Sequence, residues 1–199
     1  MNDAESSILF TYWDQLRAGR PAPDRAEIDP RDIAPILGDT FILEGDRTGA
    51  LPYRLAGSRV CALFGREMKG VGFLDAYSDT GRTTAIRALR DAHAANAGLF
   101  MALTGTSTAG RTLALEATVL PLVHRGRIGA RMIGCLTAPE TPYWVGRDGI
   151  ETIAVNAVRL LWPSWSAASA IAGDATIQPG LRPFAGRPAL RVIQGGNVA

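Results

Sequence analysis

Three strand-like runs joined by short turns place the strongest constraint on how this chain folds. They cover residues 99–107, 111–124 and 127–138. In the middle run, apolar residues recur at every second position, the period of a strand with one buried face: Leu113, Leu115, Ala117 and Val119. The third run places a similar set on one side, namely Ile128, Ala130, Met132 and Leu136. Because short glycine-bearing connections join antiparallel neighbours, we expect an antiparallel meander.

Two further strands and a series of helices are predicted upstream. Residues 40–45 and 51–57 flank a polar turn that contains glycine, so they are expected to form a hairpin. Short helices are expected within residues 58–77. Residues 80–97 predict the longest helix, with a buried stripe of Ile86, Leu89, His93 and Ala97. This order predicts an α+β fold in which the helices gather on one face of a single antiparallel sheet.

The two ends of the chain give weaker signals. Ile8, Tyr12 and Leu16 recur at helical spacing, and Asp29 followed by Pro30 is typical of a helix start. Residues 150–162 predict either a strand or a helix. The last residues are punctuated by glycine and proline, so an extended or mobile tail is expected, with a short strand at residues 189–196. The predicted units are an N-terminal helix and loop, one folded domain, and the tail, at residues 1–38, 39–162 and 163–199.

Composition narrows the class of protein. The chain has 199 residues, 47% of them hydrophobic, which suffices for one substantial core but is short for two full domains. Its net charge of +2 gives no support to nucleic-acid binding. Cys61 and Cys135 are the only cysteines and form no CxxC pattern, so we expect no disulfide or zinc site and a cytoplasmic location. The acidic N-terminus fits neither a signal peptide nor a membrane span.

Three motifs stand in order along the chain. They read YWxxLRxGRxxPxRxxIDPxDI at residues 12–33, RLAGxRxCxLFGRExxG at 54–70 and PYWxG at 142–146. Together they resemble a bacterial family related to the PAS domain. The order of elements also resembles the PAS fold, a five-stranded antiparallel sheet interrupted after its second strand by short helices and one longer helix. This resemblance implies a sensory or interaction module, and Gly65, Glu67 and Gly70 are similar to the glycine, acid and glycine that follow the short helix in PAS sequences.

A fold of this kind encloses a space between its helices and its sheet, which is either a filled core or a ligand pocket. Gly57, Gly65 and Gly70 permit tight chain reversals there. We favour a filled core, because protein interiors are close-packed. A ligand pocket would instead be lined by Arg54, Val60, Phe64, Phe73, Ile86, Leu89, His93, Leu115 and Met132.

Two of these residues have alternative interpretations. Haem-binding PAS domains resemble this arrangement in carrying a proximal histidine on the long helix, so His93 is the expected ligand if haem is bound. No cofactor is otherwise predicted. Arg54 either faces inward and holds an anion, or faces outward and pairs with an acid such as Glu44, and we favour the second arrangement.

Catalytic machinery is not predicted. The only histidines are His93 and His124, there is no GxSxG elbow, and the glycines form no phosphate-binding loop. Light-sensing PAS relatives carry their reactive cysteine in an NCRFLQ-like stretch, which this sequence lacks. Cys61 and Cys135 are therefore expected to act as small hydrophobes, and no catalytic or metal-binding residue is assigned.

The expected function is that of a non-enzymatic sensory or regulatory module that acts through protein–protein interaction. Its partner is expected to be a second copy of the chain or a separate signalling protein, with neither nucleic acid nor membrane insertion. Four aromatic residues of the kind enriched at interfaces are expected to contribute: Tyr12, Trp13, Tyr143 and Trp144. A small-molecule or haem-binding sensor is the first alternative, and an uncharacterised enzyme on the same scaffold is the second.

Overall fold

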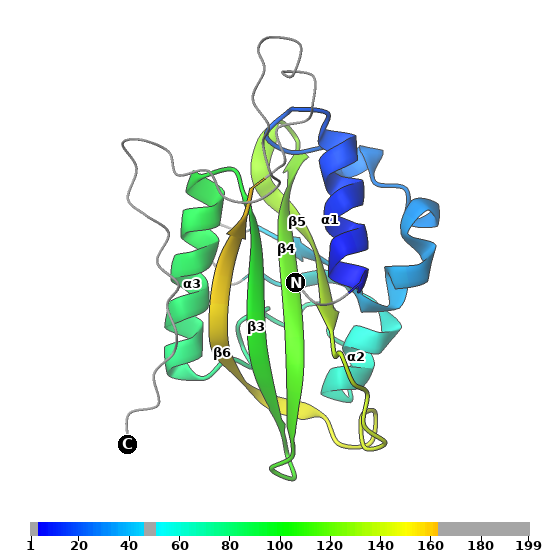
Figure 1. The fold of residues 1–199 in the computed structure, drawn as a ribbon, viewed down its shortest axis with the longest axis vertical. Coiled ribbons are helices and arrows are strands. Elements are labelled where there is room, and N and C mark those ends of the chain that lie inside the picture. Colours follow the sequence, from blue (N-terminus) through cyan, green and yellow to red (C-terminus); the bar gives the residue numbers. More distant parts are fainter. Residues whose placement is uncertain (1–3, 46–50, 163–199) are drawn as a thin grey trace, which may run out of the picture.

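An antiparallel sheet of six strands forms the centre of the computed structural model, which describes residues 4–45 and 51–162 (Figure 1). The strands lie in the order β2-β1-β5-β4-β3-β6. Their bounds are β1 (Thr40–Glu44), β2 (Tyr53–Ala56), β3 (Gly98–Ser107), β4 (Thr112–His124), β5 (Arg127–Thr137) and β6 (Ile150–Leu161). The first hairpin and the later meander are confirmed, but the expectation of five strands was wrong by one. The predicted tail, with its short strand, lies outside the described residues.

The sixth strand resolves the ambiguity of residues 150–162. β6 pairs with the free edge of β3 along almost its whole length, from Gly98 opposite Leu161 to Ser107 opposite Ile150. The register shifts at Ala102 and Leu103, because β6 carries an extra residue, Asn156, at that point. The shift interrupts the two-residue alternation, which is why the sequence alone did not separate strand from helix.

Helices α2 (Ser58–Phe64) and α3 (Asp79–Ala94) cover one face of the sheet, here called the inner face. The buried side of α3 differs from the prediction. It consists of Gly81, Ala85, Ala88 and Ala92, whereas Ile86 and His93 are exposed. A Cβ atom on Gly81 would lie 3.2 Å from the carbonyl oxygen of Ile153, so the helix approaches β6 closely. Only small residues fit such an approach. The predicted stripe of larger residues therefore did not identify the buried side of α3.

The opposite, outer face is also covered in part, by the N-terminal helix that was expected in addition to the helices on one face. Helix α1 (Ala4–Arg17) and the 3₁₀ segments η1 (Arg25–Glu27) and η2 (Pro30–Asp39) pack against β4 and β5 there. Leu120, Leu122 and Ile133 point outward from the sheet and need this cover. The cluster joins residues from both sides of the predicted boundary at residues 38 and 39.

The ends of the N-terminal elements have local causes, and η2 begins at the helix start that the sequence predicts. Ala18 and Gly19 adopt positive φ angles directly after α1, and Asp29 caps η2 by accepting a hydrogen bond from the Arg31 N–H at 2.9 Å. Within the described residues, no helix is long and apolar enough to span a membrane.

The predicted alternation of β5 fails at its start. The register between β4 and β5 shifts between Leu122 and Val123, and Gly129 has a φ of 75°. As a result, Ile128 packs against the outer cluster while Met132 packs against the inner one, so they do not share a side.

Candidate functional site

The segments that follow the first and the third motif both pack against α2, which belongs to the central motif. Gly57, before α2, approaches η2 so closely that a Cβ atom on it would lie 2.3 Å from the carbonyl oxygens of Leu37 and Gly38. At the other end of α2, a Cβ atom on Gly149 would lie 2.4 Å from the carbonyl oxygen of Phe64. Backbones that approach this closely tolerate only glycine. Packing thus explains the glycine at position 57 of the central motif.

A carboxylate fixes the segment that follows the third motif. Asp148 accepts hydrogen bonds from the hydroxyl groups of Ser107, at 2.6 Å, and Thr108. These two bonds, Ser107 foremost, hold the pKa of Asp148 below its ordinary value, and the Arg111 guanidinium 4.0 Å away acts in the same direction. Arg111 also lies over the ring of Tyr143, 5.8 Å from the ring centroid. The cluster ties the loop before β6 to the β3–β4 hairpin.

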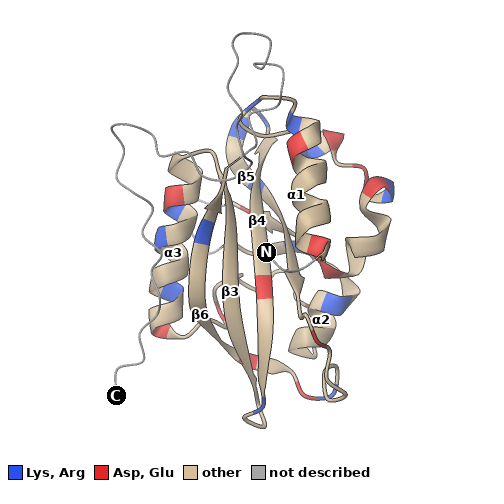
Figure 2. Ribbon diagram, viewed as in Figure 1, with Lys and Arg blue, Asp and Glu red and all other residues tan. Residues whose placement is uncertain are grey.

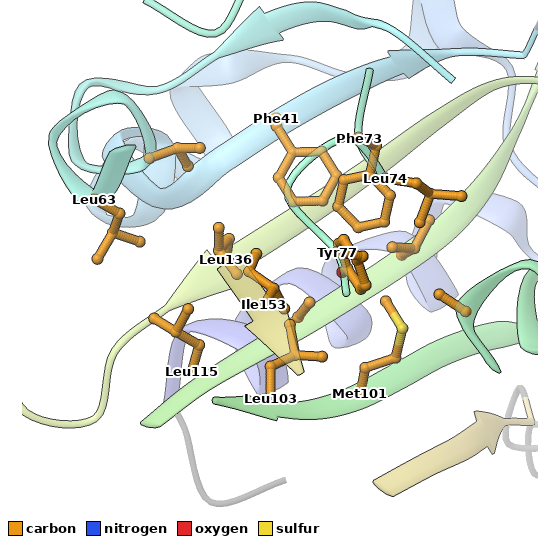
Figure 3. Packing of buried hydrophobic residues seen from close by; sticks show 14 of the residues in the cluster. Phe41, Leu63, Phe73, Leu74, Tyr77, Met101, Leu103, Leu115, Leu136 and Ile153 are labelled. Carbon is orange, nitrogen blue, oxygen red and sulfur yellow. The ribbon is translucent and has the colours of Figure 1, made fainter. Parts of the chain in front are cut away.

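The space between α2, α3 and the sheet is filled by side chains of the chain itself (Figure 3). The rings of Phe41, Tyr53, Phe73 and Tyr77 pack together, with centroid distances of 5.5–5.8 Å. Six of the nine residues predicted to line a pocket belong to this core or pack against it: Val60, Phe64, Phe73, Leu89, Leu115 and Met132.

The other three predicted pocket residues do not face the core. Arg54 is exposed on β2, and Glu44 pairs with Arg131 at 2.6 Å rather than with Arg54. Ile86 is 39% exposed on the outer side of α3. His93 is exposed and lies against the backbone of Gly129, where a Cβ atom would come within 2.7 Å of Nδ1. Its imidazole therefore does not line the core, which removes the expected position of a haem ligand.

One polar atom in the core stands out. The hydroxyl group of Tyr77 is enclosed and has no hydrogen-bond partner among the described residues. Burial in this apolar cluster raises the pKa of Tyr77 far above its ordinary value. The pKa of Tyr53 is raised as well, through burial first and the neighbouring Tyr77 second. An unpartnered buried hydroxyl is unfavourable, so a hydrogen bond to a water molecule or to a ligand atom would stabilise this group.

Only one of the four predicted interface aromatics lies fully on the surface. Trp13 is buried in the outer cluster, where its Nε1 donates a hydrogen bond to the Pro121 carbonyl at 2.7 Å. Trp144 is buried in the core. The Tyr12 hydroxyl accepts a hydrogen bond from the Asp29 N–H at 2.8 Å, which leaves its ring half-buried. Tyr143 is 82% exposed. Trp13 and Trp144 thus contribute to folding rather than to a free surface.

Part of the outer sheet face, beside α1, is not covered by any helix of the described residues and is here called the open face. It consists of β3, β6 and the first half of β4, which no helix crosses in front (Figure 1). Its side chains form rows across three strands, because β3 pairs with both neighbours. Thr104 lies between Ala114 and Ala154, and Ala102 lies between Glu116 and Ala157. The face is made mostly of small and weakly polar side chains.

Charge is sparse on the open face. Figure 2 shows it largely uncharged, with red on β4 and blue on β6, and a second acid, the exposed Glu151, lies at the start of β6. The acid on β4 is Glu116, whose Oε2 is enclosed without a hydrogen-bond partner among the described residues. The base is Arg159, whose guanidinium lies over the ring of Phe100, 5.2 Å from the centroid. Neither has an ion-pair partner in the described part of the chain.

Sequence reasoning missed the open face. None of its residues belongs to a recognisable motif. They become neighbours only because β6 pairs with β3, and the sequence did not show whether residues 150–162 form a strand. The available signal was the run of small and hydroxyl residues at alternate positions of two predicted strands, namely Ala102, Thr104 and Thr106 with Thr112 and Ala114.

The surface is hollowed in two places, the second of which borders the open face at Thr112 and Ala114. One, of about 420 Å³, is lined by Tyr12, Gln15, Leu16 and Asp32. The other, of about 350 Å³, lies between the start of β4 and the loop at Pro139, Glu140 and Pro142. None of the nine predicted pocket residues lines either hollow. Across residues 4–45 and 51–162, no three His, Cys, Asp or Glu side chains are grouped as metal ligands would be.

Several solved structures are similar to this chain at low identity. The dark structure of the blue-light photoreceptor Aureochrome1 LOV is 14% identical, covers 58% of this chain and 83% of its own, and has a TM-score of 0.44. The Rhodobacter sphaeroides LOV protein is 13% identical, with coverage of 58% and 71% and a TM-score of 0.44. An RNA-binding Light-Oxygen-Voltage receptor is 18% identical, with coverage of 63% and 37% and a TM-score of 0.43. At these values, nothing about ligands or partners carries over.

The sequence itself gives the stronger comparison. No curated protein matches the chain. The family model described as the PAS domain matches residues 1–137, which is more than half of the chain. That stretch contains α1, the α2–α3 layer and the first five strands. By this match, the chain belongs to the PAS domain family.

Proposed function

We propose that this PAS domain is a non-enzymatic regulatory module that binds a protein partner through the open face. The observation that carries the proposal is the composition of that face: small residues on three paired strands, exposed or part-exposed, beside a helix that covers the rest of the sheet. A flat surface of small side chains lets another sheet or helix approach closely. The sparse charge lowers the cost of removing water.

The core contributes to the proposed function by transmitting changes to the open face. Its apolar side chains hold the sheet and α2 and α3 as one packed unit. A change in the core would therefore reach the open face directly, because inner and outer side chains alternate along the same strands. This coupling suits a regulatory module.

Photo-crosslinking in the cell tests the proposal. A photoreactive amino acid at Thr106 or Ala154, both on the open face, is expected to capture one discrete protein. The matched control is Thr83, an exposed threonine on α3. Equal capture at all three positions, or no capture at Thr106 and Ala154, would contradict the proposal.

A small ligand in the core is the second candidate function, and the Tyr77 hydroxyl favours it. A ligand with one polar atom would give this group the hydrogen bond that it lacks among the described residues. Native mass spectrometry of the purified protein, with an absorption spectrum, would reveal a bound molecule. Tyr77→Phe is expected to abolish its binding and leave the fold intact. A ligand-free native protein that Tyr77→Phe stabilises would contradict this second function.

A further inference from the structure

Three arginine side chains without ion-pair partners lie at one end of the molecule, here called the basic end. Arg90 lies near the C-terminal end of α3, and Arg125 and Arg127 lie in the turn between β4 and β5. All three are exposed, and none forms an ion pair with another described residue. Figure 2 shows blue both on α3 and at the turn between β4 and β5.

A direct contact joins the two parts of the basic end. His93 lies about one turn after Arg90 and packs against Gly129, where a Cβ atom would come within 2.7 Å of its Nδ1. Gly129 follows Arg127 by two positions on β5. Arg125 has a φ of 51° and Gly126 a φ of 73°, as in a tight two-residue hairpin turn. The turn is therefore the outermost point of the β4–β5 hairpin, and it lies beside the end of α3.

The other charges of this region balance one another. Residues three or four positions apart on a helix are neighbours, so an acid and a base at that spacing largely cancel. Each acid near the basic end has a basic neighbour, through an ion pair or within a few positions in sequence: Glu44 with Arg131, Glu27 with Arg20, Asp91 with Arg87, Asp79 with Arg82, and Asp24 with Arg25. An excess of positive charge therefore remains on the three arginines of the basic end.

Exposed apolar side chains accompany these cations. Ile86 is 39% exposed and lies one turn before Arg90 on the same side of α3. Trp162 is 47% exposed and follows Leu161, which pairs with Gly98, the first residue of β3 after α3 ends at Ala94. Because Leu161 packs into the outer cluster, strand alternation places Trp162 on the other side of the sheet, where α3 lies.

We propose that the basic end binds anionic lipid headgroups at a membrane surface. Each arginine near such a surface adds to the attraction, and tryptophan is enriched at the level of the headgroups. Stable peripheral binding takes two signals, and here the cations and Trp162 supply them. A helix end and a hairpin turn form a convex surface, which suits a flat lipid surface better than the groove of a protein partner. The binding is peripheral, because side chains alone reach the lipid.

This inference goes beyond the proposed function, because it uses a different part of the molecule. The open face lies on the outer side of the sheet, whereas α3 covers the inner side. A chain held at a membrane by the basic end would thus still present Thr106 and Ala154 to a protein partner. The membrane would concentrate the module where membrane-bound partners are found.

Vesicle co-sedimentation of the full-length chain provides the test. One set of vesicles contains phosphatidylserine mixed into phosphatidylcholine, and the other contains phosphatidylcholine alone. The native chain is expected to bind the anionic vesicles at least about tenfold more tightly than the neutral ones. High salt is expected to abolish the difference, because it screens exposed charges.

Neutral substitutions locate the binding surface. Arg90→Gln and Arg127→Gln each remove one positive charge, so each is expected to lower the partition onto anionic vesicles about fivefold, and the double variant about 25-fold. Trp162→Ala is expected to weaken binding to both kinds of vesicle. The matched control is Arg66→Gln, because Arg66 is an exposed arginine just beyond α2 and its neighbour Gly65 lies against Gly149, away from the basic end. It should bind like the native chain.

Three results would overturn the inference. The first is a native chain that does not prefer anionic vesicles at low salt. The second is Arg66→Gln weakening the binding as much as Arg90→Gln does. The third is a chain that ignores the vesicles and binds soluble polyglutamate through Arg90 and Arg127, which would make the partner an acidic protein. Photo-crosslinking at Thr106 or Ala154 tests the proposed function separately, so either idea can fail while the other stands.

Discussion

Arg59 and Asp39 bind each other through two hydrogen bonds, and so join the central motif to the end of η2. Arg59 Nε donates to Asp39 Oδ1 at 2.7 Å, and Nη2 donates to Oδ2. The Asp39 side chain is 10% exposed, whereas that of Arg59 is 56% exposed. Arg59 Nη2 also donates to the Pro35 carbonyl at 3.1 Å. The pair fixes α2 against η2.

Loss of Arg59 should therefore weaken the fold. Arg59→Ala leaves a largely buried carboxylate without its cation, so the free energy of unfolding is expected to fall by about 1–3 kcal/mol. Urea denaturation measures the change. Arg66→Ala, which removes an exposed arginine just beyond α2, is the control and should change stability by less than about 0.5 kcal/mol. Equal effects of the two substitutions would refute the role given to the pair.

The substitution Gly57→Ala tests the close approach of the backbone before α2 to that of η2. Its φ of −68° suits any residue, so the penalty for Gly57→Ala comes from contact with the carbonyl oxygens of Leu37 and Gly38 alone. We expect a loss of about 3 kcal/mol or more, because backbone atoms cannot move aside as a side chain can. At Gly70, with a φ of 85° and open space around it, alanine should cost only about 1–2 kcal/mol. Thermal unfolding of both variants compares them, and the reverse order would contradict the packing described.

Trp13 tests the docking of α1 on the outer face. Trp13→Ala removes a fully buried ring and its hydrogen bond to Pro121, so it should lower the free energy of unfolding by about 3–5 kcal/mol. Ile8→Ala, at a 43% exposed position of the same helix, should cost less than about 1 kcal/mol. Chemical denaturation followed by circular dichroism provides the values. If Trp13→Ala lowered the free energy of unfolding no more than Ile8→Ala does, α1 would not pack against the outer face as described.

The lowered pKa of Asp148 predicts that the stability of the fold depends on pH in the acidic range. Its pKa lies below the ordinary 3.8, mainly because the Ser107 hydroxyl binds the ionised form. The group therefore contributes stability that is present above its unfolded pKa of about 3.9 and is lost as pH falls through the folded value. Ser107→Ala should raise the native pKa of Asp148 toward 3.8, as followed by carboxyl-carbon NMR, while Thr112→Ala on the same hairpin should not. An unchanged titration in Ser107→Ala would refute the assigned cause.

The sequence predicted the elements of this fold better than the faces that they present. Alternation identified β4, because one of its sides lies in the core, and short glycine-bearing turns identified its neighbours β3 and β5. Hydrophobic periodicity failed for α3, where close packing selects Gly81 and Ala85 over the larger Ile86, and a hydrophobicity pattern gives those small residues little weight. It failed again for β6, whose period is broken at Asn156.

The candidate site was harder to predict than the fold for a physical reason. The predicted interface consisted of large aromatic residues. Of these, Trp13 and Trp144 are buried in the chain's own hydrophobic clusters. The open face consists instead of β3, β4 and β6, and β6 is far from β3 in sequence and becomes its neighbour only once the two strands have paired. No local pattern carries that information.

Photo-crosslinking at Thr104 tests the central claim most directly. Thr104 lies on β3 within the open face, between Ala114 and Ala154. A photoreactive amino acid at Thr104 is expected to capture one discrete protein in the cell, whereas the same amino acid at Thr83, which is exposed on α3, is expected to capture none. No capture at Thr104, or equal capture at Thr104 and Thr83, would contradict the account.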